Sequence, residues 1–248
     1  MRPFLFWVLG LLFFLIPPPL FAQTTYTWTG KSGSEWGNPE NWNPIGAPKE
    51  GDSVILDLQT GNVGVHISEY DFVSLNELTI NSPAILLTTN ASVQVQKLRL
   101  QQGTIQGGFY SVGSGFFWNG GKLDNVTVSV FGLSEMSGEE LTLVQSNLSY
   151  QGDLVVTAPQ NSPMTVWTTG GSINTYFGNR SMYFSGDQDI SFRASRAVEP
   201  ITTINVSGLL TKTGRASVNL TGVLTFGDIL VEAGLLALQM SENPGNPF

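Results

Sequence analysis

Short runs in which apolar and polar residues alternate constrain this chain more than any other sequence feature. They recur from Val54 to Leu238, separated by clusters of Asn, Gly and Ser, with no convincing helical stretch among them. Such alternation is typical of strands that bury one face and expose the other. The runs are Val63–Ile67, Leu75–Ile80, Val93–Leu100, Val126–Val130, Leu141–Val144, Leu154–Val156, Val218–Leu220, Ile229–Val231 and Leu235–Leu238. The pattern therefore predicts an all-β protein.

Imperfect internal repeats indicate how these strands are arranged. The run that contains Leu78 and Ile80 is echoed by the next run, in which Leu98 and Leu100 take the equivalent places. A second echo aligns Trp118 and its following glycine pair with Trp167 and the glycine pair after it. The first echo has an offset of about 20 residues, which suits one coil of a solenoid.

Two architectures fit short strands at this spacing, an antiparallel β-sandwich and a right-handed parallel β-helix. The β-helix needs fewer assumptions, because the runs continue from Val54 to Leu238 without a linker. We therefore expect a β-helix over residues 59–240, with on the order of eight or nine coils, preceded by a Trp-rich cap at residues 23–58. Polar runs such as Thr88–Asn90 are expected to stack as side-chain ladders.

Composition narrows the possible chemistry. Only 12% of the residues are charged, the formal net charge is -8, and the chain has one histidine and no cysteine. A negative chain has no general affinity for phosphate backbones or anionic lipid, so we expect no nucleic-acid partner. Disulfides, thiol nucleophiles and His-rich zinc sites are excluded, no metal-spaced cluster or phosphate loop is present, and no cofactor is expected.

The N-terminal segment, residues 1–22, has the organisation of a secretory signal. Arg2 precedes the apolar run Phe4–Ile16, three prolines follow, and Ala22 offers a small residue at a cleavage point. The run is shorter than the roughly 20 residues of a membrane-spanning helix. We expect a secreted or cell-surface protein without a membrane span once the signal is removed. Residues 241–248 are predicted to be a short Pro-rich tail or a truncation point.

Two segments resemble parts of exported bacterial β-helix proteins. Tyr26–Gly30, Trp36–Trp42 and Pro48–Leu56 resemble the opening segment of autotransporter-like passengers and large adhesins. Ser207–Gly214, together with Ile229–Leu238, is similar to the passenger-associated transport repeat of autotransporters, although Leu235 stands where Thr is common. These resemblances imply a β-helical rung, export from the cell and a mostly structural role.

The three tryptophans of the opening segment are candidate ligand-binding residues. Trp28, Trp36 and Trp42 could form a flat platform for sugar rings, or they could cover the open first coil. Burying such a ring contributes roughly 4 to 6 kcal/mol, and a solenoid requires a cap, so capping is the favoured interpretation.

Candidates for catalysis are sparse. Asp187 and Asp189 are separated by one residue and are expected to share a strand face, with Arg193 and Arg196 nearby. Such a pair could bind calcium or serve as acid and nucleophile, although a polar turn is the simpler interpretation. His66 should point outward, opposite its apolar neighbours, without a partner that orients it as a base.

Six Asn-x-Ser/Thr triplets are more simply polar ladder positions than glycan acceptors. They begin at Asn90, Asn125, Asn147, Asn179, Asn205 and Asn219.

The sequence thus predicts a non-enzymatic, exported structural or adhesive rod that binds glycans or cell-surface proteins through repeated polar faces. The rival class is a carbohydrate-active β-helix enzyme, a polysaccharide lyase or hydrolase. At the C-terminal end, the apolar run Leu235–Met240 is either capped by residues 241–248, or open and stacked end to end on a second copy or on a further domain.

Overall fold

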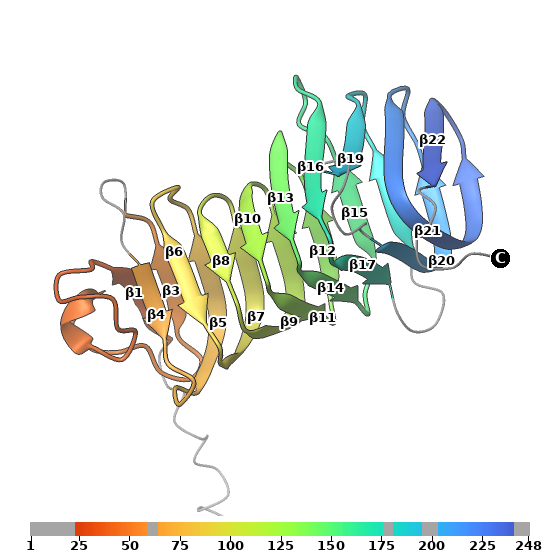
Figure 1. The fold of residues 1–248 in the computed structure, drawn as a ribbon. Helices are drawn as coiled ribbons and strands as arrows, with labels where there is room; N and C mark the ends of the chain where they lie inside the picture. Colours follow the sequence, from red (N-terminus) through yellow and green to blue (C-terminus); the bar gives the residue numbers. More distant parts are fainter. Residues whose placement is uncertain (1–22, 59–63, 176–180, 195–202, 241–248) are drawn as a thin grey trace, which may run out of the picture.

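The computed structural model describes residues 23–58, 64–175, 181–194 and 203–240. These residues form a parallel β-solenoid whose coils follow one another along a rod (Figure 1). The N-terminal segment contains a 3-10 helix, Pro39–Asn41 (η1). The strands are β1 (Thr25–Trp28), β2 (Trp42–Asn43), β3 (Ser53–Leu56), β4 (Gly64–Ile67), β5 (Val73–Ile80), β6 (Leu86–Thr89), β7 (Ser92–Leu100), β8 (Thr104–Gln106), β9 (Phe109–Trp118), β10 (Gly121–Asp124), β11 (Thr127–Val130), β12 (Leu133–Met136), β13 (Glu140–Val144), β14 (Asn147–Tyr150), β15 (Leu154–Thr157), β16 (Met164–Thr169), β17 (Ser172–Thr175), β18 (Met182–Ser185), β19 (Ile190–Ala194), β20 (Thr203–Lys212), β21 (Ser217–Val231) and β22 (Leu235–Met240).

Parallel pairing between successive coils confirms the predicted solenoid and excludes the sandwich. Within the described ranges, the one antiparallel strand pair joins β1 to β2 at the N-terminal end. Sheet B contains β4, β6, β8, β10, β13, β16, β19, the start of β21, and β22. The remaining strands form sheet A, and β1 already pairs in parallel with β3. Coil stacking therefore begins within the segment that the sequence assigns to the cap.

Sheet A bends along the length of each coil, so that a coil has three faces. The first arm runs through 73–75, 92–95, 109–112, β11, β14, β17, 203–206 and 223–226. The second arm runs through β3, 77–80, 97–100, 115–118, β12, β15, β18, 209–212 and 228–231. Sheet B supplies the third face. The eight strands of the first arm and the nine of sheet B agree with the expected number of coils.

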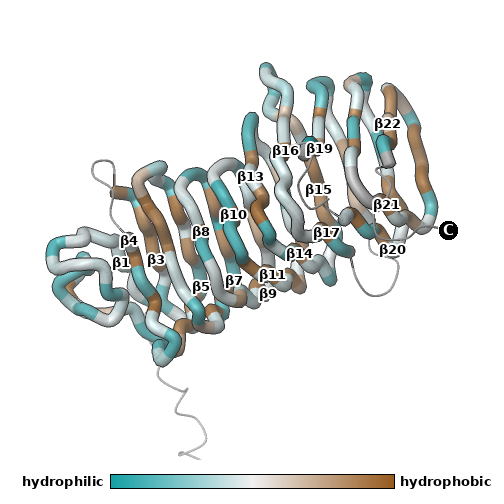
Figure 2. The backbone as a smooth tube through the Cα atoms, viewed as in Figure 1, coloured by the Kyte–Doolittle hydropathy of each residue, from teal (hydrophilic) through white to brown (hydrophobic). Residues whose placement is uncertain are grey.

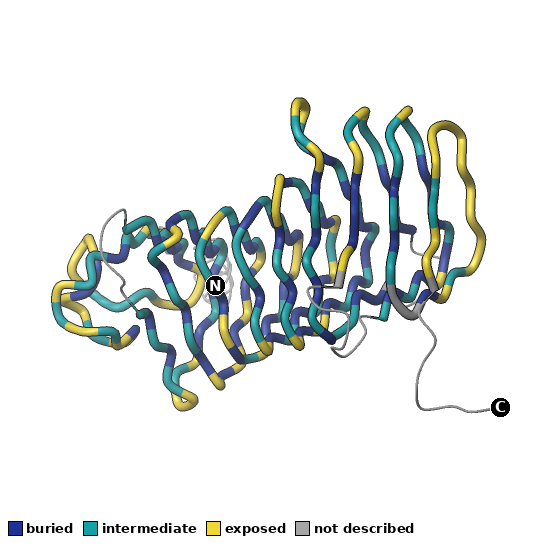
Figure 3. Tube along the Cα trace, turned by 45° about the horizontal axis from the view of Figure 1, so that its top comes forward, coloured by how far each residue is buried: buried dark blue, intermediate teal, exposed yellow. Residues whose placement is uncertain are grey.

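Stacking places equivalent side chains above one another, and this builds the core. Inward positions alternate with outward ones along nearly every strand, as the burial pattern in Figure 3 shows. One inward row of the second arm contains Leu56, Ile80, Leu100, Trp118, Met136, Val156, Phe184 and Lys212. All eight side chains are buried. The apolar residues of the alternating runs therefore form a continuous, largely apolar column inside the rod.

The first echo is confirmed, because Leu78 pairs with Leu98 and Ile80 with Leu100. The second echo is wrong as a structural repeat. Trp118 lies on the second arm of sheet A, where its neighbours are Leu100 and Met136, whereas Trp167 lies on sheet B. Coil length also varies, since Val93 pairs with Tyr110 across a short coil and Ser172 pairs with Thr203 across a long one.

Glycines at the corners allow adjacent coils to approach closely. Gly121 begins β10 with a φ of +79°, and a Cβ atom there would lie 2.5 Å from the backbone oxygen of Gly103. The corner therefore requires both the left-handed conformation and the absence of a side chain.

We expect Gly121→Ala to lower the free energy of unfolding by about 2 kcal/mol or more, because strain at positive φ adds to a clash with backbone. Gly64→Ala is the matched control. Gly64 also begins a sheet B strand, but nothing lies within 4 Å of its Cβ position, so this change should stay within about 0.5 kcal/mol of the wild type. Urea unfolding followed by circular dichroism measures both, and equal stabilities would contradict the corner constraint.

Candidate functional site

The three tryptophans of the opening segment form the core of the N-terminal cap. Trp28, Trp36 and Trp42 are only 1%, 3% and 1% exposed. The ring of Trp42 meets those of Trp28 and Trp36 edge-on, with centroids 4.9 and 4.8 Å apart, and its Nε1 donates to the backbone oxygen of Trp36 at 2.7 Å. None of the three offers a free face to a sugar, so the platform interpretation is wrong.

The sequence predicts that Asp187 and Asp189 share a strand face, and this prediction is wrong. They lie in the turn between β18 and β19, where the Oδ1 atoms accept backbone N–H groups of the next coil, Arg215 at 3.5 Å and Ser217 at 2.8 Å. Arg193 projects separately from β19, and Arg196 lies outside the described residues. The carboxylates thus tie two coils together in a polar turn.

The charges of the same aspartates act on a buried cation, Lys212. Lys212 lies in the inward row of the second arm, next to Phe184, and is 1% exposed. Its Nζ donates to the backbone oxygens of Thr213 at 2.5 Å, Gly214 at 2.9 Å and Ala233 at 3.4 Å. Burial lowers the pKa of this ammonium group, and the charges of Asp187 and Asp189 oppose that shift. This lysine belongs to the repeat-like C-terminal segment, where it joins the last coils through their carbonyl groups.

His66 points outward, and it has a hydroxyl neighbour. Its Nδ1 lies 3.1 Å from Oγ1 of Thr88, the residue one coil along. The row continues through Gln106 and Asp124, and a shallow hollow of about 280 Å³ lies beside it. Glu35 forms a parallel β-bridge with His66, but among the described residues the imidazole makes no hydrogen bond to a carboxylate of the kind that orients a catalytic base.

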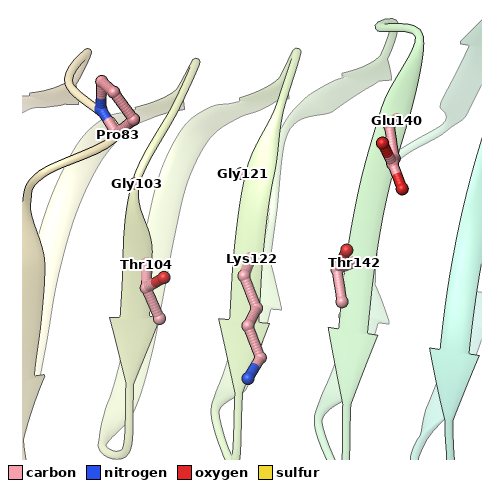
Figure 4. Close-up of a pocket in the computed structure, with 7 residues that line it drawn as sticks. All are labelled: Pro83, Gly103, Thr104, Gly121, Lys122, Glu140 and Thr142. Carbon is pink, nitrogen blue, oxygen red and sulfur yellow. The ribbon is translucent and has the colours of Figure 1, made fainter.

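A second hollow of about 270 Å³ lies across the starts of β8, β10 and β13 (Figure 4). Thr104, Lys122 and Thr142 stand in one row on neighbouring strands, and the lysine side chain points away from Glu140. Lys122 instead forms an ion pair with Asp124, with Nζ and Oδ2 2.9 Å apart. The hollow is lined by two hydroxyl groups, the Lys122 side chain and the Glu140 carboxylate, a surface suited to weak polar contact.

The first arm carries the longest polar ladders. We call two columns the ladder face: Thr127, Asn147, Ser172 and Thr203 in one column, and Ser111, Ser129, Ser149, Asn174 and Asn205 in the other. Asn174 is only 5% exposed, so the other members provide the accessible surface. Hydrogen bonds link successive coils within each column, because Asn205 Nδ2 donates to Asn174 Oδ1 at 2.7 Å and Ser172 Oγ donates to Asn147 Oδ1 at 2.8 Å. The ladders were expected, but the face on which they gather emerges only from the register.

The ladder face is free of charge. From β5 to β20, no outward position of the first arm in the described ranges holds an ionisable side chain. By contrast, the second arm presents Glu77, Lys97, Arg99 and Glu135, and sheet B presents Lys122, Asp124, Glu140 and Arg193. Phe109, which is 62% exposed, stands in the first column between Ser92 and Thr127. An exposed aromatic side chain therefore stands within an uncharged polar surface.

The Asn-x-Ser/Thr triplets divide between ladders and turns. Asn147 and Asn205 belong to the ladder face, and Asn219 is outward on sheet B. Asn90 and Asn125 lie in turns instead, the latter with a φ of +54°, so the ladder interpretation fails for these two. Asn179 lies outside the described residues.

Comparisons with protein-family models, with curated proteins and with solved structures find no match to this chain. In the described part of the chain, no helix has the length and apolar character needed to cross a membrane. Nor do these residues bring three or more His, Asp or Glu side chains together in an arrangement that could hold a metal ion.

We expect Trp36→Ala to destabilise the protein by about 3 to 5 kcal/mol, because it empties a packed aromatic cluster. Urea unfolding measures the change. Tyr70→Ala is the control, since that ring is 89% exposed and its removal should leave stability nearly unchanged. A Trp36→Ala protein as stable as the wild type would contradict the structural role of the cap.

Proposed function

We propose that this protein is an exported adhesive rod whose ladder face binds uncharged polysaccharide. The observation that carries the proposal is the pair of uncharged polar columns on one arm of the solenoid, with the exposed side chain of Phe109 in the first column. The mechanism is geometric, since the rod presents a fixed array and undergoes no chemical change.

The spacing of the array suits a repeating ligand. Successive side chains in a column are about 4.8 Å apart, the distance between neighbouring strands. Hydroxyl and amide groups both donate and accept hydrogen bonds, as sugar hydroxyls do. No ion must lose its hydration when a neutral chain covers this face, so desolvation costs less here than on the two charged faces. Phe109 adds an apolar surface for the C–H side of a sugar ring.

Export is supported by the signal-like residues 1–22 and by the resemblance of the opening and closing segments to autotransporter passengers and adhesins. A protein outside the cell without disulfides needs another source of rigidity. Continuous backbone pairing and the apolar column inside the rod provide it.

The rival proposal, a polysaccharide lyase or hydrolase, depends on Asp187, Asp189, Arg193 and Arg196. It is disfavoured because the two described carboxylates accept backbone hydrogen bonds inside a turn. Incubation with polyuronates and neutral glycans tests it directly, since new reducing ends or unsaturated products that disappear in Asp187→Asn would establish catalysis.

We expect Ser149→Lys and Phe109→Ala each to weaken sedimentation with insoluble cellulose, chitin or β-glucan at least tenfold. The lysine introduces an ion that must be desolvated at the centre of the ladder face, and the alanine removes the ring. Thr79→Lys, an outward substitution on the second arm, should bind as the wild type does. If the wild type sediments with none of these polysaccharides, or Ser149→Lys binds equally well, the proposal fails.

We further propose that the rod self-associates through its C-terminal end. Ile229, Leu230, Val231, Leu235 and Leu238 are all 40% or more exposed on the last described coil (Figures 2 and 3). The opposite end is closed by the antiparallel β1–β2 pair and the tryptophan cluster, so two rods would meet by their C-terminal ends. Such contact is two-fold and closed, and it yields a dimer rather than a filament.

Light scattering of the mature chain should show a monomer–dimer equilibrium that Leu235→Lys shifts at least tenfold towards monomer. Leu133→Lys is the matched control, because both leucines are 57% exposed but Leu133 lies on the side of the rod. A wild-type protein that stays monomeric at high concentration would contradict this association.

A further inference from the structure

Trp167 differs from the other described tryptophans. Trp28, Trp36, Trp42 and Trp118 are buried in the core, whereas Trp167 occupies an outward position of β16 and is partly exposed. Its neighbours along the strand, Val166 and Thr168, point inward and are buried. A partly exposed amphipathic ring fixed on a rigid strand is suited to sugar stacking.

The register places a cation directly beside this ring. Trp167 pairs with Arg193 on β19, one coil further along, and with Thr142 on β13, one coil before. Strands β16 and β19 lie side by side (Figure 1) and are paired along the whole of β19, so the separation of the two side chains is set by the sheet. The sequence had grouped Arg193 with Asp187 and Asp189, and the structure groups it with Trp167.

The charge of Arg193 is not neutralised within the described part of the chain. Two other outward cations have carboxylate partners, since Arg99 Nε lies 2.6 Å from Glu77 Oε1 and Lys122 pairs with Asp124. Arg193 is exposed and forms no such pair there. The nearby aspartates accept backbone N–H groups of the next coil instead. A planar guanidinium group with open donors matches a carboxylate.

We propose that Trp167 and Arg193 form a binding site for a sugar acid. The indole ring stacks on the apolar side of the sugar, the guanidinium group binds its carboxylate, and Thr142 lies on the opposite side of the ring, where its hydroxyl can meet the sugar hydroxyls. The site lies on sheet B, away from the ladder face, and does not depend on the neutral-glycan proposal. Because the net charge is -8, the ligand is a short or terminal acidic saccharide rather than a long polyanion.

Trigalacturonic acid and its methyl ester test this site, because they share one backbone and differ in charge. Calorimetry should show the acid bound at least tenfold more tightly than the ester. Arg193→Gln should abolish this preference, and Trp167→Ala should weaken binding of both compounds at least tenfold. Arg215→Gln and Tyr183→Ala, an exposed cation and an exposed ring elsewhere, are the matched controls and should bind as the wild type does. Thermal unfolding verifies that each variant is folded.

Equal affinity for acid and ester, absence of binding to the wild type, or full binding by Arg193→Gln or Trp167→Ala would overturn the proposal. Ser149→Lys separates the two proposals, since it should weaken sedimentation with neutral polysaccharide at least tenfold and leave trigalacturonate binding intact. Loss of acid binding in Ser149→Lys would place the acid on the ladder face and overturn the Trp167–Arg193 site.

Discussion

Direct stacking of each strand on the equivalent strand of the next coil is the constraint on which the structure depends. It places every side chain against a counterpart about 4.8 Å away, so inward columns must be largely apolar and outward columns must be compatible with their own neighbours. Low charge content follows, because like charges in a column repel one another. The corners obey the same rule, since a Cβ atom at Gly121 would meet the carbonyl of Gly103 in the coil before.

Stacking also divides the surface into faces with different chemistry. The first arm gathers uncharged Ser, Thr and Asn side chains, while ion pairs occur on the second arm and on sheet B. The two ends differ as well, one covered by tryptophans and the other exposing apolar side chains. The faces and ends of the rod therefore differ in the kind of contact that each can make.

Lys212 shows how the fold accommodates a violation of its own pattern. It occupies an inward position between Phe184 and Val231, where an unpaired charge would be costly. Three backbone carbonyls accept its hydrogens, and Asp187 and Asp189 supply compensating charge. The aspartates that looked like a catalytic pair thus have a structural use, which no pattern within their own turn reveals, because their partners come from the next coil.

The sequence by itself determined the fold class, the solenoid and the pairing of Leu78 with Leu98, because the alternation and the clear echo between these two runs are visible along the chain. Only the tertiary structure decided which side chains share a face. The coil that separates Val93 from Tyr110 is much shorter than the one that separates Ser172 from Thr203, so sequence spacing does not identify partners across coils. For that reason Trp118 and Trp167, which look equivalent in the sequence, lie on different sheets. For the same reason Arg193 lies beside Trp167 and not with the aspartates that are close to it in the sequence.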